Sequence, residues 1–191
     1  MSIVAPNQPV FYYDLGSPGC YLAAEAIMTA LPVVPEWEPV LGVGLAPGRA
    51  QEADRRQIEA QAAELGLQPL RWPNQWPPDT ERAMLAATYA KRIGRAVAFS
   101  LAAFRQAFAG GRDLGDENTI LIAGAACEMH PTALNKGIDL SSTRTALAQA
   151  DRRALTAGVT ALPAIQVAGR VFAGASAIPD AAAALERVRI A

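Results

Sequence analysis

The sequence predicts an α/β protein with a large helical part. An aromatic and β-branched run over residues 10–14 indicates a first strand, and apolar residues at helical spacing over 18–31 indicate a helix directly after it. Polar and apolar residues roughly alternate over 36–41, which indicates a second strand. Strand-like sequence returns only over 164–173. The strand–helix–strand start predicts a parallel pair of strands with a right-handed crossover.

The middle of the chain is expected to form a series of helices that begin at capping residues and end at glycines. Residues 68–78 are an exception, because four prolines and two tryptophans favour an extended segment there. The pair His130-Pro131 is expected to end a helix. The two late strands are separated by a tight turn at residues 168–169. The expected helices after the second strand span residues 49–65, 80–94, 95–109, 116–130, 141–157 and 178–190.

The turn between the first strand and the first helix carries the main candidate site. Gly16 permits an unusual backbone angle, Ser17 is a good helix N-cap, and Pro18 suits the first helical position. A serine hydroxyl is thereby placed beside unpaired N–H groups and the positive end of the helix dipole, which stabilise an anion or a thiolate. Ser17 and Cys20 have the spacing of a Cys-x-x-Cys motif whose leading cysteine is replaced by serine. A dithiol–disulfide cycle cannot run within such a motif.

Composition bounds the class of protein. The chain has 191 residues, 51% of them hydrophobic and 18% charged, with a formal net charge of −1. These values predict a globular protein with a substantial core, and the charge gives no electrostatic case for binding nucleic acid or an anionic membrane. Two distant cysteines do not form a disulfide framework. With no long apolar run and no signal-like start, a soluble, cytoplasmic protein is expected.

Several stretches, taken in order, resemble one known family. They are Ser17-Pro18-Gly19-Cys20, residues 67–73 with 77–83, a Gly-Val-x-x-x-Pro pattern at 158–163, and a Gly-Arg-x-Phe-x-Gly pattern at 169–174. Together they resemble the thioredoxin-like family that joins DsbA-type oxidoreductases, kappa-class glutathione transferases and 2-hydroxychromene-2-carboxylate isomerases. The stretches at 67–73 and 77–83 are similar to the isomerase branch. The resemblance implies a thioredoxin-like fold with a large all-helical insertion after the second strand. It places the thioredoxin-like domain at residues 1–45 and 158–191, and the helical insertion domain at 46–157.

The resemblance assigns glutathione as the cofactor. It implies that the Ser17 hydroxyl binds the glutathione sulfur and keeps it as a thiolate, which is the nucleophile that a transferase or isomerase needs. The alternative is that Ser17 is only an N-cap, worth about 1 kcal/mol to the helix. The resemblance also implies a cis bond between Leu162 and Pro163, so that the Leu162 backbone can pair with the cysteinyl part of glutathione. The alternative there is a structural proline that ends a loop.

Three further positions differ from the family pattern. Ser176 lies where the γ-glutamyl end of glutathione is expected, but many family members have an Asp-Arg pair at the positions of Ser176 and Ala177. In kappa-type members the loop after the second strand also contributes a lysine and an asparagine. This chain has no lysine there and has Arg49 near the asparagine position. These departures are expected to weaken glutathione binding.

A substrate pocket is expected to involve aromatic residues. By resemblance, Trp72, Asn74 and Trp76 face the cleft between the two parts and form a wall for a planar substrate, with Tyr12 bordering the turn. The alternative for the tryptophans is a hydrophobic cover over the helical part. Asp14 either orients a substrate or completes the turn, and the sequence does not decide between these roles.

Three functions follow. The first is a glutathione-dependent isomerase or transferase that adds the thiolate to an unsaturated aromatic substrate. The second is a single-cysteine thiol–disulfide oxidoreductase using Cys20, although the apolar helical stripe around Cys20 favours a buried side chain. The third is a non-catalytic thioredoxin-like binding module. Cys127 is expected in the core and His130 at a surface helix end. No His, Cys, Asp or Glu residues have the spacing of metal ligands. Many members of the family that the chain resembles are dimers, so the resemblance implies a homodimer.

Overall fold

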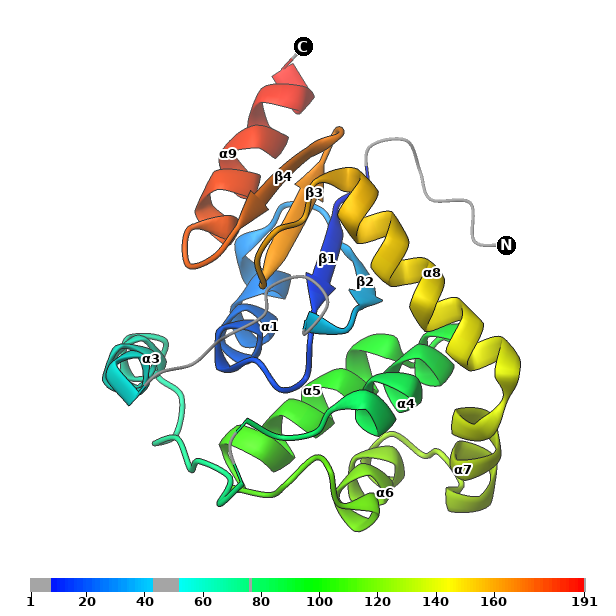
Figure 1. Ribbon diagram of the computed structural model, residues 1–191. Helices are drawn as coiled ribbons and strands as arrows, with labels where there is room; N and C mark the ends of the chain where they lie inside the picture. Colours follow the sequence, from blue (N-terminus) through cyan, green and yellow to red (C-terminus); the bar gives the residue numbers. More distant parts are fainter. Residues whose placement is uncertain (1–7, 43–51, 76, 191) are drawn as a thin grey trace.

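The strands of the computed structural model, which describes residues 8–42, 52–75 and 77–190, form one mixed four-stranded sheet in the order β2-β1-β3-β4 (Figure 1). β1 (Val10–Tyr13) pairs in parallel with β2 (Glu36–Pro39), as the strand–helix–strand pattern predicts. β3 (Ala164–Val167) pairs antiparallel with β1, and β4 (Arg170–Ala173) pairs antiparallel with β3. The late strands therefore complete a sheet that begins near the amino terminus, and the α/β class is confirmed.

Helices cover both faces of the sheet. Residues of α1 and α9 share the main hydrophobic cluster with Phe11 and Tyr13 of β1, while α8 packs on the opposite face against Tyr12 (Figure 1). Helices α4 to α7 form a block below the sheet in this view, while α3 lies apart from that block, at the left beside α1 (Figure 1). The assignment of residues 1–45 with 158–191 and of 46–157 to separate domains stays a prediction. The helices described are α1 (Pro18–Ala30), α3 (Glu52–Glu64), α4 (Glu81–Arg92), α5 (Ala96–Phe108), α6 (Glu117–Ala126), α7 (Pro131–Asp139), α8 (Ser141–Ala157) and α9 (Ala177–Ile190).

One helix departs from the sequence expectation. Pro131 does not simply end a helix, because it occupies the first position of α7. His130 is the N-cap of α7, and its Nδ1 accepts a hydrogen bond from the Thr132 N–H at 3.3 Å. A proline at this position loses nothing, since the first N–H groups of a helix have no partner within the helix.

A buried hydrogen bond joins the sheet to the helical block. The rings of Phe11, Tyr13 and Trp37 pack together, with centroid distances of 5.0 to 5.5 Å, and Tyr13 also meets Phe104 of α5 at 5.9 Å. The Tyr13 hydroxyl and Ser100 Oγ, also of α5, are 2.6 Å apart and fully buried. Burial raises the pKa of the Tyr13 phenol, so this hydroxyl stays neutral. The main core therefore runs without a break from β1 into α5.

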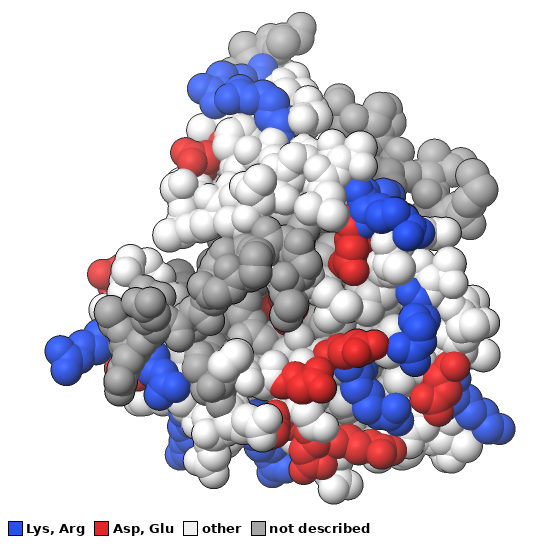
Figure 2. Space-filling model, viewed as in Figure 1, with Lys and Arg blue, Asp and Glu red and all other residues white. Residues whose placement is uncertain are grey.

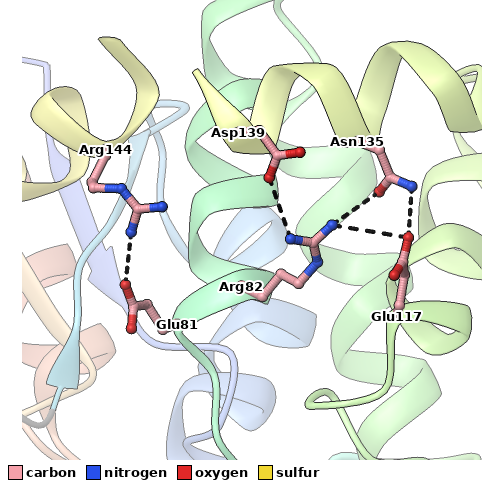
Figure 3. Close-up of polar contacts among 6 residues, drawn as sticks. All are labelled: Glu81, Arg82, Glu117, Asn135, Asp139 and Arg144. Atoms are coloured by element: carbon pink, nitrogen blue, oxygen red, sulfur yellow. Dashed lines mark hydrogen bonds and ion pairs between the residues drawn. The ribbon is translucent and has the colours of Figure 1, made fainter. Parts of the chain in front are cut away.

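Arg82 of α4 connects three helices (Figure 3). Its guanidinium contacts Asp139 of α7 at 3.4 Å, Asn135 of α7 at 3.4 Å and Glu117 of α6 at 3.9 Å. Asn135 in turn donates to Glu117 at 2.6 Å. The three helices that meet here are therefore held by polar contacts at their ends as well as by their apolar faces.

Charged side chains of both signs are interspersed over α4, α6, α7 and α8 on the face shown in Figure 2. One pair visible in Figure 3 joins Arg144 of α8 to Glu81 of α4 at 3.0 Å. Such exposed pairs contribute about 0 to 1 kcal/mol each. In the part of the chain that the structure describes, no helix combines the length and the apolar character needed to cross a membrane.

Candidate functional site

Ser17 stands at the N-terminus of α1, as the sequence predicts. It is the N-cap, with an extended backbone (φ −93°, ψ 116°), and its Oγ accepts a hydrogen bond from the Cys20 N–H at 3.3 Å. Pro18 occupies the first turn. The Ser17 N–H is itself bound by the Asp14 carbonyl at 3.1 Å. The residue is half-buried, so its hydroxyl lies beside the amides of the first helical turn without being sealed in the core.

The Leu162-Pro163 loop lies directly beside this turn. The bond between these two residues is cis, as the sequence analysis expects. Gly19 shows how close the two segments are: a Cβ added there would lie 3.3 Å from Pro163 Cδ and 3.8 Å from Ser17 Oγ. Within the described part of the chain, neither backbone polar group of Leu162 has a hydrogen-bond partner. The loop therefore offers an unpaired peptide group next to the Ser17 turn.

The start of α9 adjoins the same loop. The Gly174 N–H donates to the Pro163 carbonyl at 2.8 Å, and Ser176 follows two residues later as an exposed residue. Ala177 is the first residue of α9 and is 1% exposed, so its side chain packs into the core. Arg49 lies outside the described residues. The structure therefore brings Ser17, Pro163 and the segment that carries Ser176 to one side of the molecule.

Asp14 directly follows β1 and faces the turn with a buried carboxyl group. Its two oxygens accept hydrogen bonds from the N–H groups of Gly16 and Gly42, each at 2.7 Å. Burial raises the pKa of this carboxyl, and bonds from the two amides and from the Thr80 side chain lower it. The sequence left the role of Asp14 open, and the structure shows that it completes the turn. Its bond to Gly42 joins two segments that the sequence does not show to be neighbours.

Cys20 is fully buried, with an exposed fraction of 0%. Burial raises the pKa of its thiol to about 12, against a smaller lowering by hydrogen bonds with the Ser17 side chain and the Asp14 backbone. A thiol with such a pKa is almost wholly protonated at neutral pH and is a poor nucleophile. Cys127 is also buried, and its Sγ donates to the Ala123 and Gly124 carbonyls. The geometry thus favours the structural alternative for Cys20.

Tyr12, predicted to border a substrate pocket, lies on the face of the sheet opposite α1. It is 4% exposed, packs against α8, and donates from its hydroxyl to Gln166 Oε1 at 2.9 Å. Its place in a substrate pocket stays a prediction. Side chains alternate along a strand, so Tyr12 must point away from the face that Phe11 and Tyr13 share with α1. The orientation of Tyr12 is therefore readable from strand alternation alone.

Trp72 behaves as the cover over the helical part that the sequence analysis weighed as an alternative. Its Nε1 donates to Glu59 of α3 at 2.7 Å, Arg55 lies over its ring at 4.9 Å, and its edge meets Phe108 of α5 at a centroid distance of 6.2 Å. Asn74 is exposed. Trp76 lies outside the described residues. Sequence reasoning missed the place of Gly19 in the site, although its position inside the Ser-Pro-Gly-Cys motif was a signal.

A metal centre has no donor set in the described ranges, because no three His, Cys, Asp or Glu side chains gather there as ligands would. What the site offers instead is a hydroxyl, helix-terminal amides and an unpaired loop backbone. These groups are suited to hold a polar, peptide-like molecule that carries a thiol or an anion.

Comparison with solved structures places this arrangement among known folds. The structure of a 2-hydroxychromene-2-carboxylate isomerase matches with a TM-score of 0.84 at 14% identity, covering 95% of each chain. A probable DsbA oxidoreductase from Streptomyces coelicolor matches with a TM-score of 0.77 at 20% identity, covering 96% of this chain and 90% of the other. The cytosolic disulfide reductase DsbM from Pseudomonas aeruginosa, solved with GSH, matches with a TM-score of 0.69 at 17% identity, covering 96% and 100%.

At these identities the likeness shows the shared fold alone, which confirms the thioredoxin-like fold expected from the sequence. Comparison with curated proteins gives no match. A family model described as a DSBA-like thioredoxin domain matches residues 10–186, nearly the whole chain. The chain therefore belongs to the DSBA-like thioredoxin domain family.

Proposed function

We propose that this protein is a glutathione-dependent isomerase or transferase in which Ser17 stabilises the glutathione thiolate. The observation that carries the proposal is the position of the Ser17 hydroxyl, at the N-terminus of α1 and beside Pro163. A serine there replaces the cysteine that a dithiol enzyme would need, and the remaining Cys20 is buried with a raised pKa. The site therefore suits a thiolate supplied by a ligand better than one supplied by the chain.

The residues present fit glutathione in three ways. The missing Cβ at Gly19 leaves space between Ser17 and Pro163. The unpaired Leu162 backbone offers both a donor and an acceptor to the peptide part of the ligand. The exposed Ser176 at the start of α9 offers a hydroxyl for the γ-glutamyl end. The buried Ala177 offers nothing to a ligand, which agrees with the expectation of weakened binding.

When bound, glutathione supplies a thiolate that adds reversibly to an unsaturated carbon of an aromatic substrate. The chain's own task is to favour that ionisation. The Ser17 hydroxyl donates a hydrogen bond to the sulfur, and the positive end of the α1 dipole lowers the pKa of the thiol toward neutral pH. The backbone of Leu162 fixes the orientation of the ligand, so that proximity contributes to the rate.

The test is a calorimetric titration with reduced glutathione, together with the ultraviolet absorbance of the bound thiolate. Ser17→Ala is expected to weaken binding and to raise the pKa of the bound thiol. Since Ser17→Ala also removes an N-cap worth about 1 kcal/mol, a matched control is needed. Asp116→Ala removes the cap of α6, where the Asp116 carboxylate accepts from the Asn118 N–H at 2.9 Å. The control should lose similar stability but keep glutathione binding, and Ser17→Thr should keep both.

Two results would count against the proposal. Absence of binding at millimolar glutathione would favour the non-catalytic binding module. Unchanged affinity and unchanged thiol ionisation in Ser17→Ala would leave Ser17 as an N-cap alone. An aromatic substrate, a cytoplasmic location and a homodimer remain parts of the proposal. Among the structural neighbours, DsbM is named as cytosolic and was solved with GSH.

A further inference from the structure

The Asp14 carboxylate joins two segments of the chain beside the candidate site and lies near a third. One oxygen accepts from the Gly16 N–H in the Ser17 turn, and the other accepts from the Gly42 N–H at the exit of β2. The Thr80 side chain at the start of α4 lies near this carboxyl and lowers its pKa. The residue is 6% exposed, so water competes little for these bonds and each of them strongly restrains the backbone that it holds.

The side chain of Thr80 does not cap α4. Thr80 is the N-cap residue of α4, but its side chain makes no capping bond, and Asp79 Oδ1 accepts from the Glu81 N–H at 3.1 Å in its place. A Cβ added at Gly16 would lie only 2.6 Å from Thr80 Cγ2. The Ser17 turn therefore packs directly against the start of α4, next to Asp14.

A second carboxylate holds the neighbouring amide at the exit of β2. Asp151 of α8 accepts from the Leu41 N–H at 2.8 Å, so two successive backbone amides, those of Leu41 and Gly42, are bound by carboxylates from different elements. A Cβ added at Gly42 would meet Leu162 Cδ1 at 3.3 Å. The exit of β2 thus lies against the residue that precedes Pro163. Only Asp14, however, also binds the Ser17 turn.

We propose that Asp14 is the positioning residue of this site: its carboxylate holds the Ser17 turn and the exit of β2 in one fixed arrangement, next to the start of α4. The inference rests on the proposed function in so far as Ser17 binds a ligand. Asp14 holds the turn twice, because its carbonyl accepts from the Ser17 N–H while its side chain accepts from the Gly16 N–H. It acts through these amides and does not touch the ligand.

Asp14→Asn is the first test. The amide has nearly the shape of the carboxylate, but its NH₂ group faces a backbone N–H, so that either Gly16 or Gly42 loses its acceptor. Loss of one charged hydrogen bond predicts a rise of about tenfold to hundredfold in the glutathione dissociation constant. The hydrogen-exchange protection of the Cys20 amide, which Ser17 Oγ caps, should fall in the free protein.

Asp151→Ala is the matched control. It removes the acceptor of the Leu41 amide at the same exit of β2 but leaves Gly16 and the Ser17 turn bound to Asp14. Glutathione affinity should then stay within about twofold of the wild type, and Cys20 exchange should not change. A merely structural loss at the exit of β2 would affect both variants alike, whereas positioning of Ser17 predicts a difference between them.

The outcomes separate the two proposals. If the wild type does not bind glutathione, the proposed function fails, yet Cys20 exchange in the free Asp14→Asn protein still decides the positioning role. If Asp14→Asn folds with unchanged Cys20 protection and unchanged affinity, the positioning role is overturned. If Asp14→Asn does not fold, Gly42→Ala takes its place, because the new Cβ would lie 3.1 Å from Asp14 Oδ2 and displace the carboxylate without removing it. Unchanged Cys20 protection in Gly42→Ala would overturn the inference equally.

Discussion

Alkylation of Cys20 in the native protein is expected to be extremely slow. Burial raises the pKa of this thiol from an ordinary value of 9.0 to about 12. Three pKa units reduce the thiolate fraction at neutral pH by about a thousandfold, and the thiolate is the form that reacts. The thiol is also 0% exposed, so a reagent reaches it only when the first turn of α1 opens. Both effects act in the same direction.

The assay is mass spectrometry of iodoacetamide labelling at pH 7 in a Cys127→Ala background, so that Cys20 is the only thiol. The reference is the same protein unfolded in guanidinium. The native rate should be lower than the unfolded rate by about a thousandfold or more. A native rate within about tenfold of the reference would refute the reasoning and revive the single-cysteine oxidoreductase.

The same pKa shift predicts a dependence of stability on pH. The folded-state pKa of Cys20 lies above the unfolded one, so the stabilisation is complete below about pH 9 and is lost as the pH rises toward 12. Relative to Cys20→Ala, the free energy of unfolding of the wild type should fall by about 1.4 kcal/mol per pH unit across that window. Denaturant unfolding of both proteins measures this slope, and parallel pH profiles would contradict the shift.

Three further predictions concern other residues. Gly19→Ala should weaken glutathione binding in calorimetry without lowering the melting temperature, since alanine favours the helix by up to about 1 kcal/mol over glycine while its Cβ fills the space between the Ser17 turn and the cis-proline loop. Ser100→Ala leaves the Tyr13 hydroxyl buried without its partner and should lower the free energy of unfolding by about 1 to 3 kcal/mol. A double-mutant cycle with Tyr13→Phe should show a coupling energy of about 1 kcal/mol. Additive effects of the two substitutions would contradict the hydrogen bond. Arg82→Ala should cost about 1 kcal/mol, with a smaller cost in 1 M salt, because the Arg82 side chain is 37% exposed; an equal cost at both salt concentrations would show that its charge is not involved.

Local signals predicted the start of the fold well. The turn into α1 follows from Gly16, Ser17 and Pro18, whose conformational preferences act within a few residues, and the structure places the N-cap at Ser17. The α/β class followed from strand and helix periodicity at the two ends of the chain. α7 was missed because Pro131 breaks a helix in most positions but begins one at the first. A proline inside a helix therefore predicts a break, whereas a proline at the first helical position predicts a start, and the sequence alone does not distinguish the two at Pro131.

The long-range parts of the site could not be predicted in this way. Asp14 gains its role only through its bond to Gly42, and Trp72 becomes a cover only through its contacts with α3 and α5. No pattern within one segment contains these partners. The side of the sheet that Tyr12 faces was available from strand alternation, since Phe11 and Tyr13 carry the apolar face that meets α1.

The replacement of a leading cysteine by Ser17 and the burial of Cys20 have one physical consequence in common. In a Cys-x-x-Cys motif the first turn of the helix stabilises a thiolate of the chain itself. Here the helix-terminal amides and dipole are still present, but the only thiol of the motif is sealed in the core with a raised pKa. The amides and the dipole of α1 can therefore stabilise an anion that binds from solution. The Ser17 hydroxyl beside them cannot itself form a disulfide. A site so arranged favours a bound thiol that is regenerated after each turnover over an exchange of disulfides, which is why the ionisation of glutathione, and not a redox assay, is the more decisive measurement.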